Sequence, residues 1–237
     1  MKAPMAGRSK MKPLAVALMS GGMDSCVAAA IAQRRYRVAA LHASYGQRTA
    51  GREKRAFRQI CARMGIEETL ELDLGFLKKI GGSSLTDPSR PVPELHPVKG
   101  IPSTYVPFRN GILLAAAASW AEALGARAVF IGAVAPDGPD GYPDTTRAFF
   151  NAFEGAVKIG TKPQTKIRMM APLVDADKAE VARRGLKLKA PLELTWSCYQ
   201  SEKIACGRCL SCIGRLKAFE KIGVEDHIRY EGNPGKR

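Results

Sequence analysis

The sequence predicts an α/β protein with a Rossmann-like, parallel, five-stranded sheet and helices on both faces. Short apolar runs, which are typical of buried strands, alternate along the chain with longer helical patterns. The first apolar run stops at a Gly-Gly turn, and a helical pattern begins at once, as in folds that bind phosphate. Four closely spaced cysteines near the C-terminus lie outside this alternation and predict a small metal-binding subdomain.

The length and composition predict one large domain with a small appendage. We expect residues 1–13 to form a flexible basic tail, residues 14–190 the α/β domain, and residues 191–237 the cysteine-containing subdomain. Met5 and Met11 are equally good biological starts. No apolar run reaches the roughly 20 residues that a bilayer requires, and cleavage of a leader here would destroy the Gly-Gly turn. These features predict a cytoplasmic protein without a membrane segment.

The net charge is +15, from 37 Lys and Arg against 22 Asp and Glu. An excess of basic residues is typical of proteins that bind nucleic acid. However, the basic residues are scattered through helical patterns and tails, and they do not form one patch with interleaved aromatic residues. A solvated basic surface that attracts ATP and an acidic substrate is therefore favoured over RNA binding.

The alternation of strands and helices follows the chain in order. Strands are predicted at residues 14–19, 36–42, 66–72, 127–132 and 167–171. Helices are predicted from Asp24, over residues 49–64, 112–124 and 145–159, and from about Asp177. Residues 75–107 are rich in Pro and Gly and predict a long connection that either serves function, for example as a lid, or is partly disordered.

The turn after the first predicted strand reads Ser20-Gly21-Gly22-Met23-Asp24-Ser25. Glycines let a backbone approach phosphate closely, and the positive end of the following helix attracts an anion. No lysine occurs between Lys12 and Lys54, which excludes a Walker-type loop. The hexapeptide resembles the SGGxDS signature of the PP-loop ATP pyrophosphatases, which adenylate a substrate carbonyl and release pyrophosphate. The alternative is an ordinary turn in which Asp24 and Ser25 cap the helix.

Two further loops leave the same expected edge of the sheet. Arg109 and Asn110 precede a strongly helical run, where the guanidinium could bind phosphate or carboxylate. Alternatively, Asn110 caps the helix and Arg109 lies on the surface. Residues 135–144 concentrate acids and turn residues, and they fit a magnesium or substrate site as well as they fit a solvated turn.

Four of the six cysteines predict a closed tetrahedral zinc site with a structural role: Cys198, Cys206, Cys209 and Cys212. An iron–sulfur cluster and disulfides are the alternatives, and the expected cytoplasmic location argues against disulfides. Cys26 and Cys61 are expected to pack in the core. Cys26 follows the Gly-Gly turn and is the only thiol placed for a sulfur-transfer reaction.

The motifs together resemble the 7-cyano-7-deazaguanine synthase family of the queuosine pathway, over about residues 14–218. The resemblance rests on segments that occur in order: SGGMDS, residues 44–48 (SYGQR), 84–86 (SLT), 106–110 (VPFRN), 141–144 (GYPD), 177–180 (DKAE), 195–199 (TWSCY) and 206–212 (CGRCLSC).

This resemblance implies a carbon–nitrogen ligase that uses ATP, Mg²⁺ and a structural Zn²⁺. In this family, 7-carboxy-7-deazaguanine is adenylated, captured by ammonia as an amide, adenylated again and dehydrated to the nitrile. It implies a small-molecule substrate without nucleic acid, a possible homodimer, and no amino-acid nucleophile. The alternative is a PP-loop enzyme that modifies tRNA directly by thiolation or ligation.

The resemblance also implies roles for single residues. Asp24 is expected to position magnesium, and Tyr142 and Asp144 to recognise the deazaguanine ring. Catalytic roles are implied for Asp24, Ser25, Arg109 and Lys178. ATP binding is implied for Met19, Ser20, Gly21, Gly22, Met23, Asp24, Ser25, Tyr45, Gln47, Arg109, Asn110 and Gly132.

The chain departs from the family pattern at two points near the expected substrate pocket. Phe108 stands where many relatives carry glycine between proline and arginine. Pro139-Asp140 precedes Gly141-Tyr142, where the family pattern has serine before Gly-Tyr-Pro-Asp. The two departures mark either a subgroup with the same substrate or an acceptor that differs.

Overall fold

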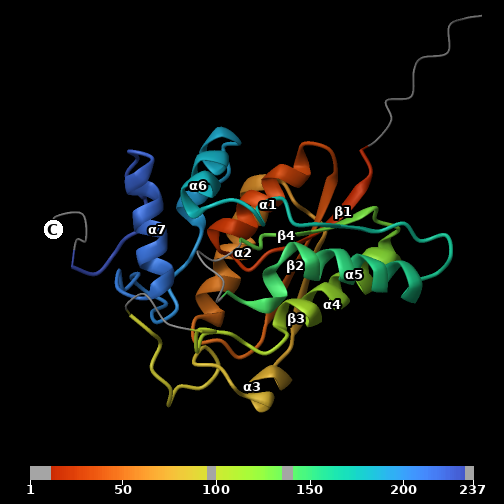
Figure 1. Ribbon diagram of the computed structural model, residues 1–237. Helices are drawn as coiled ribbons and strands as arrows, with labels where there is room; N and C mark the ends of the chain where they lie inside the picture. Colours follow the sequence, from red (N-terminus) through yellow and green to blue (C-terminus); the bar gives the residue numbers. More distant parts are fainter. Residues whose placement is uncertain (1–11, 95–99, 135–140, 233–237) are drawn as a thin grey trace, which may run out of the picture.

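The computed structural model describes residues 12–94, 100–134 and 141–232, and its centre is the predicted parallel sheet (Figure 1). The expected tail, with Met5 and Met11, lies almost wholly outside the described residues. The strand order is β3-β2-β1-β4-β5, and every neighbouring pair is parallel. The predicted fold class is therefore confirmed. The strands are β1 (Leu14–Leu18), β2 (Arg37–Ser44), β3 (Thr69–Asp73), β4 (Ala128–Ile131) and β5 (Arg168–Met170).

Helices follow or connect these strands. They are α1 (Met23–Gln33), α2 (Ala50–Met64), α3 (Phe76–Ile80), α4 (Arg109–Leu124), α5 (Arg147–Gly160), α6 (Lys178–Lys187) and α7 (Leu210–Lys221), with single 3₁₀ turns η1 (Pro143–Thr145) and η2 (Leu192–Leu194). All five predicted helices are present, whereas α3 and α7 were not predicted. Among the described helices, none combines the length and the apolar character needed to cross a membrane.

The sheet is covered on both faces because alternate side chains of a strand point to opposite sides. In β1, Ala15 and Ala17 belong to the core cluster that contains Val27 of α1 and Phe57 of α2. Val16 and Leu18 belong instead to the cluster built by α4 and α5. Helices α6 and α7 pack against each other beyond α1, at the left of Figure 1.

Two boundaries differ from the prediction by three residues, and the backbone explains both. Gly65 ends α2 in the left-handed conformation, and the Ile66 N–H still bonds to the Cys61 carbonyl at 2.9 Å. The chain therefore needs three more residues before β3 begins. Helix α4 begins at Arg109, three residues earlier than predicted, because Phe108 adopts a left-handed φ of 52° and turns the chain directly into the helix.

A buried ion pair anchors the C-terminal segment. Two nitrogens of the Arg215 guanidinium donate to Asp226, with Nε–Oδ2 2.6 Å and Nη2–Oδ1 2.9 Å. Arg215 also donates to Thr195 Oγ1 at 2.6 Å, and Tyr230 donates to Asp226 at 2.6 Å. The side chains of the pair are only 1% and 3% exposed. The network therefore joins α7 to the segment before the cysteines and to the chain end.

Substitution of Arg215 by Met should lower the free energy of unfolding by about 3–5 kcal/mol, because it leaves the Asp226 charge buried without a partner. The matched control is Arg183→Ala in α6, which breaks an exposed pair with Glu180 and should cost less than about 1 kcal/mol. Urea unfolding followed by circular dichroism measures both values. Equal losses in the two variants would contradict an anchoring role for Arg215.

Candidate active site and metal centre

A cavity of about 930 Å³ opens where the parallel strands end. Its lining includes Leu18, Ala43 and Ile131, the last or next-to-last residues of β1, β2 and β4. The chain runs outward from β1 to β3 and then returns to place β4 on the other side of β1. Ligands of such sheets bind at this switch point, so the cavity lies where a substrate is expected.

The phosphate turn, residues 20–25, occupies one wall of the cavity. Gly21 has a φ of 87°, which favours glycine, and a Cβ there would lie 2.4 Å from the Glu53 carbonyl oxygen. The Ser25 hydroxyl donates to the Gly22 carbonyl at 3.0 Å and accepts from the Ser20 N–H at 3.2 Å. Gly22 is the N-cap of α1, and it provides no side-chain cap. The helix start therefore keeps N–H groups available for an anion.

Gly132, directly after β4, permits the close approach of this strand to α1. A Cβ on Gly132 would lie 2.5 Å from the Ser25 backbone nitrogen and 2.6 Å from the Asp24 carbonyl carbon. No side chain fits between the two backbones. Gly132 thus brings the end of β4 directly against the first turn of α1, and this contact belongs to the cavity lining.

Asp24 and Lys178 form an ion pair between α1 and the first residue of α6. The turn has no lysine of its own, so Lys178 supplies an ammonium group from a segment more than 150 residues away. The second oxygen of Asp24, Oδ1, is buried and has no hydrogen-bond partner among the described residues. Such an oxygen suits a hard cation, because carboxylates are preferred magnesium ligands.

Arg109 projects into the cavity at the start of α4. Its Nη1 donates to the Tyr45 hydroxyl at 2.8 Å, and its guanidinium carbon lies 5.2 Å from the centre of that ring. No ion pair of Arg109 is found within the described part of the chain. The site therefore holds a fixed positive charge that can pair with a phosphate or carboxylate.

Asp144 and Asn110 join η1 to the first turn of α4. The Asn110 N–H donates to Asp144 Oδ2 at 2.9 Å, and the Asn110 side-chain amide donates to the Asp144 carbonyl at 3.2 Å. Burial raises the pKa of Asp144, and its Oδ1 has no partner in the described structure. Tyr142 shares a 2.6 Å hydrogen bond with Thr104 beside them. Asn110, the second residue of α4, therefore holds Asp144 in place through two hydrogen bonds.

Most of the site residues predicted from the sequence line this one cavity: Met19, Ser20, Gly22, Met23, Asp24, Ser25, Tyr45, Arg109, Asn110, Gly132, Tyr142 and Lys178. Gly21, Gln47 and Asp144 lie behind the lining. Gln47 is buried, and it accepts from the Tyr45 N–H at 2.8 Å and donates to Glu53 Oε2 at 3.0 Å. The acids at residues 137 and 140 lie outside the described residues.

Glu53 and Trp196 are among the groups of the site that were not predicted. Glu53 lines the cavity from α2, although it reads in the sequence as one charge of an amphipathic surface helix. Trp196, which follows η2, donates its backbone N–H to the Gly21 carbonyl at 2.8 Å. The only sequence signal for Glu53 is that it follows the SYGQR segment by a few residues. That segment lies at the end of the second strand.

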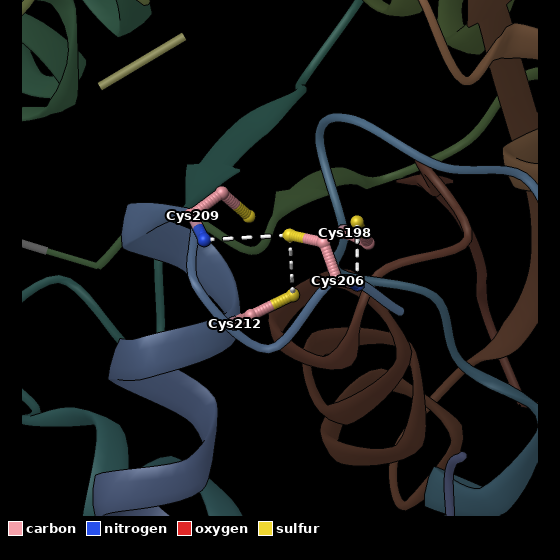
Figure 2. Close-up of side chains that lie close together, drawn as sticks. All are labelled: Cys198, Cys206, Cys209 and Cys212. Carbon is pink, nitrogen blue, oxygen red and sulfur yellow. Dashed lines mark hydrogen bonds between the residues drawn. The ribbon is translucent and has the colours of Figure 1, made fainter. Parts of the chain in front are cut away.

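The four predicted cysteines converge near the start of α7, and Figure 2 shows their side chains turned toward one another. One sulfur atom from each lies within 4.8 Å of the other three, and all four residues are buried. Backbone N–H groups of Gln200, Ser201 and Cys206 each lie 3.4 Å from the Cys198 sulfur. The Cys209 and Cys212 thiols hydrogen-bond to Cys198 and lower its pKa, which favours a thiolate.

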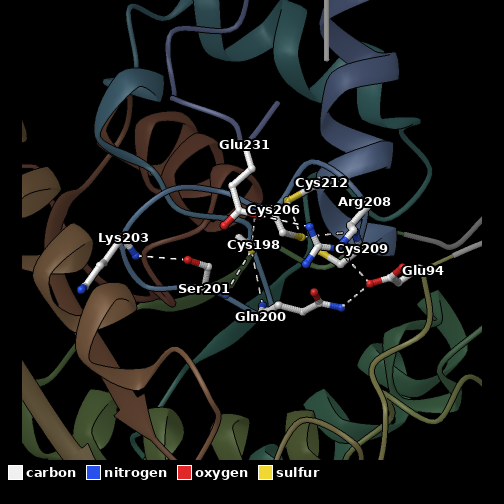
Figure 3. A network of polar contacts seen from close by, with 10 residues as sticks. All are labelled: Glu94, Cys198, Gln200, Ser201, Lys203, Cys206, Arg208, Cys209, Cys212 and Glu231. Atoms are coloured by element: carbon white, nitrogen blue, oxygen red, sulfur yellow. Dashed lines mark hydrogen bonds and ion pairs between the residues drawn. The ribbon is translucent and has the colours of Figure 1, made fainter. Parts of the chain in front are cut away.

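Polar contacts connect this cysteine cluster to the Pro- and Gly-rich connection (Figure 3). Arg208, between the second and third cysteines, donates to Glu94 at 3.0 Å and to Glu231 at 3.1 Å. Gln200 also donates to Glu94, at 3.4 Å. The connection returns to the cavity at Gly100, Pro102 and Thr104, which line it.

The other two cysteines are packed in the core. Cys26 is 0% exposed and Cys61 is 3% exposed. Burial raises the pKa of each thiol to about 12, which suppresses the reactive thiolate near neutral pH. Cys26 is therefore poorly suited to sulfur transfer, and packing accounts for both residues.

Phe108 has a left-handed backbone conformation, and its ring packs against neighbouring residues. Its φ is 52°, a conformation that glycine adopts more easily. The ring packs edge-on against Phe149 with centres 5.8 Å apart. It also covers Gly111, where an added Cβ would lie 2.3 Å from a ring carbon. The aromatic contacts thus accompany a strained turn directly before Arg109.

Comparison with known proteins finds extended similarity. The sequence profile of the family described as "Queuosine biosynthesis protein QueC" matches residues 14–223. The 7-cyano-7-deazaguanine synthase of Chlorobaculum parvum is 50% identical over 222 residues, which cover 93% of this chain and 97% of that protein. The synthase of Campylobacter curvus is 49% identical over 217 residues, covering 91% and 97%. A solved U34-tRNA thiolase, NcsA from Methanococcus maripaludis, aligns with a TM-score of 0.48 and 19% identity, covering 90% of this chain and 66% of that chain.

Gly132→Ala should weaken ATP binding by more than about tenfold and lower the free energy of unfolding by about 1–3 kcal/mol, because the new methyl group separates β4 from α1. The matched control is Gly155→Ala inside α5, where an added Cβ meets nothing within 4 Å. It should bind ATP normally and gain about 0.5–1 kcal/mol. Calorimetric ATP titration and urea unfolding measure both effects, and normal ATP binding by Gly132→Ala would refute the close-contact argument.

Proposed function

The chain belongs to the QueC family of queuosine biosynthesis proteins, and we propose that it converts 7-carboxy-7-deazaguanine, ammonia and ATP to 7-cyano-7-deazaguanine. It is accordingly an enzyme of the ligase type. The observation that carries the proposal is the convergence of the phosphate turn, Lys178 and Arg109 on one cavity at the switch point of the sheet. Three separate parts of the chain supply these groups, and each suits an anionic ligand.

The proposed chemistry uses adenylation to create a leaving group. A carboxylate oxygen leaves poorly, whereas AMP leaves well, so the acid and later its amide each react with one ATP. The free N–H groups at the start of α1 and the ammonium of Lys178 are suited to the expelled pyrophosphate. Arg109 is placed to neutralise charge that develops on the transferred phosphate.

Magnesium and the deazaguanine ring are assigned to different parts of the cavity. Asp24 Oδ1, which lacks a hydrogen-bond partner, is the proposed magnesium ligand, and the ion would shield the phosphate charges. Asp144 Oδ1 also lacks a partner. We assign Asp144, with the neighbouring Tyr142, to recognition of the ring because a carboxylate accepts hydrogen bonds from ring N–H and amino groups.

The cysteine cluster fits zinc as the bound metal. Zn–S bonds of 2.3 Å place tetrahedral sulfurs about 3.8 Å apart. Four sulfurs within 4.8 Å of one another therefore suit a single ion better than a four-iron cluster. With four protein ligands the site leaves no position for substrate. The proposed zinc is structural, and it would stabilise the segment whose backbone bonds to Gly21.

The proposal does not require nucleic acid. The cavity contains the groups for ATP and a small acidic substrate, and the positive net charge of +15 favours their approach. We propose a cytoplasmic location, where thiols remain reduced and available for a metal.

Purified enzyme incubated with ATP, magnesium, ammonium and 7-carboxy-7-deazaguanine should form AMP, pyrophosphate and the nitrile without RNA. Asp24→Ala should lower kcat/KM by about 100-fold or more, because it removes the carboxylate proposed to hold magnesium and the partner of Lys178. Mass spectrometry detects the nitrile, and a coupled assay detects pyrophosphate.

The matched control for this experiment is Asp175→Ala. Asp175 is 75% exposed at its side chain and pairs with Arg147 outside the cavity, so its removal should leave turnover unchanged. Product formation only after tRNA is added would favour the alternative of an RNA-modifying enzyme. Full activity of Asp24→Ala would contradict the assigned site.

Protein purified without added metal should contain one zinc per chain, and Cys206→Ser should lose most of it because three ligands hold zinc far more weakly than four. The control is Cys61→Ala, which changes a buried cysteine outside the cluster and should keep the zinc. Inductively coupled plasma mass spectrometry gives the metal content. A brown protein that contains iron would overturn the zinc assignment.

A further inference from the structure

Glu53 contributes a carboxylate to the cavity for which the adenylation steps have no use. Within the described residues, the acids that line the cavity are Asp24, Glu53 and Asp177. Asp24 forms an ion pair with Lys178. Asp177 forms one with Lys221 at 2.9 Å. Glu53 alone of the three has no ion-pair partner in the part of the chain that the structure covers.

Hydrogen bonds hold the Glu53 carboxylate in one orientation. Thr49 Oγ1 donates to Oε1 at 2.7 Å, and Gln47 Nε2 donates to Oε2 at 3.0 Å. Both supporting side chains are buried. The backbone carbonyl of Glu53 packs against Gly21, so the first turn of α2 lies directly on the phosphate turn. Glu53 therefore lines the cavity next to the phosphate turn, and two hydrogen bonds hold its carboxylate in place.

The surroundings of Glu53 make its carboxylate a stronger base. Burial raises its pKa, and the charge of Glu202 adds to this effect. The hydrogen bonds from Thr49 and Gln47 and the charge of Arg109 oppose the rise without cancelling it. A carboxylate with a raised pKa accepts protons more readily near neutral pH.

We propose that Glu53 binds the ammonium ion in the cavity and accepts a proton from it, which releases ammonia to attack the adenylated carboxyl carbon. This inference rests on the proposed function. Ammonium is the main form at neutral pH, and it has no lone pair for attack. Transfer of one proton to Glu53 frees that pair, the N–C bond forms, and the C–O bond to AMP breaks as AMP leaves with its electrons. The nitrogen then loses its second surplus proton to water, which gives the neutral amide.

The same carboxylate serves the second half of the reaction. After the amide oxygen is adenylated, the nitrogen must lose two protons while the C–O bond to the second AMP breaks and the nitrile forms. Glu53, once it has returned its first proton to water, accepts these protons one at a time. The step requires no oxidant or reductant, because the conversion of an amide to a nitrile is a dehydration. The amide oxygen leaves with AMP, and the two protons of the nitrogen pass to the base.

Glu53→Gln separates adenylation from proton transfer. The variant should retain exchange of pyrophosphate into ATP in the presence of the carboxylic acid, because that step needs no base. Amide formation from ammonium should fall by about 10²–10⁴-fold. In the unmodified enzyme, the rate of amide formation should rise as the pH passes through the raised pKa of Glu53. This rising part of the pH profile should be absent in the variant.

Hydroxylamine provides the rescue test, because it is largely unprotonated at neutral pH and needs no base before attack. Wild type and Glu53→Gln should form the hydroxamate at similar rates. Because Glu53 is half-buried and forms no ion pair in the described structure, its replacement should leave the melting temperature of the variant nearly unchanged. The control is Glu67→Gln, which alters an exposed carboxylate between α2 and β3 that does not line the cavity. It should keep the ammonia-dependent rate.

Two results would overturn the role of Glu53. Equal loss of exchange, amide and hydroxamate formation, with a lower melting temperature, would mean a structural role. Amide formation at the wild-type rate would mean that another group accepts the proton. Both results are measured on the Glu53→Gln variant while the wild type is active. Failure of the proposed function would be seen in the wild type itself, which would form no nitrile from the carboxylic acid.

Discussion

The close approach of backbone to backbone around the phosphate turn is the constraint on which the rest of the site depends. Helix α2 reaches Gly21 through the Glu53 carbonyl, and β4 reaches α1 through Gly132. Trp196 closes the third side with a hydrogen bond from its N–H to the Gly21 carbonyl. These contacts leave no room for side chains, so they hold the turn rigidly while its N–H groups remain directed at a ligand. Tight packing and anion binding are therefore parts of one arrangement.

The charged groups of the cavity come from elements that are distant in the sequence. Lys178 lies at the start of α6 and Arg109 at the start of α4, yet both line the same cavity as the phosphate turn. Acids that have a basic partner in the cavity, such as Asp24, can hold a metal or phosphate geometry without acting as bases. Glu53 differs because hydrogen bonds, and not an ion pair, support it. The cavity thus holds one acid in an ion pair and another by hydrogen bonds alone.

The sheet and its ligand edge could be predicted because strand periodicity and the glycine turn are local signals. The segment from β1 to α1 needs no distant partner to be recognised. Helix α4 began earlier than predicted because the left-handed Phe108 replaces an ordinary cap. Arg215 and Glu53 could not be identified because each reads as one charge on a helix surface. Arg215 is buried with Asp226, and Glu53 contacts Gly21 through its backbone, and only the folded chain brings these residues together.

The ring of Phe108 limits what position 111 accepts while the ring keeps its place. One edge of the ring occupies the space that a β-carbon on Gly111 would need. Phe108 is 54% exposed, so a larger residue at 111 would turn the ring outward into solvent and away from Phe149. The two positions are therefore coupled, because the aromatic contact with Phe149 depends on glycine at 111.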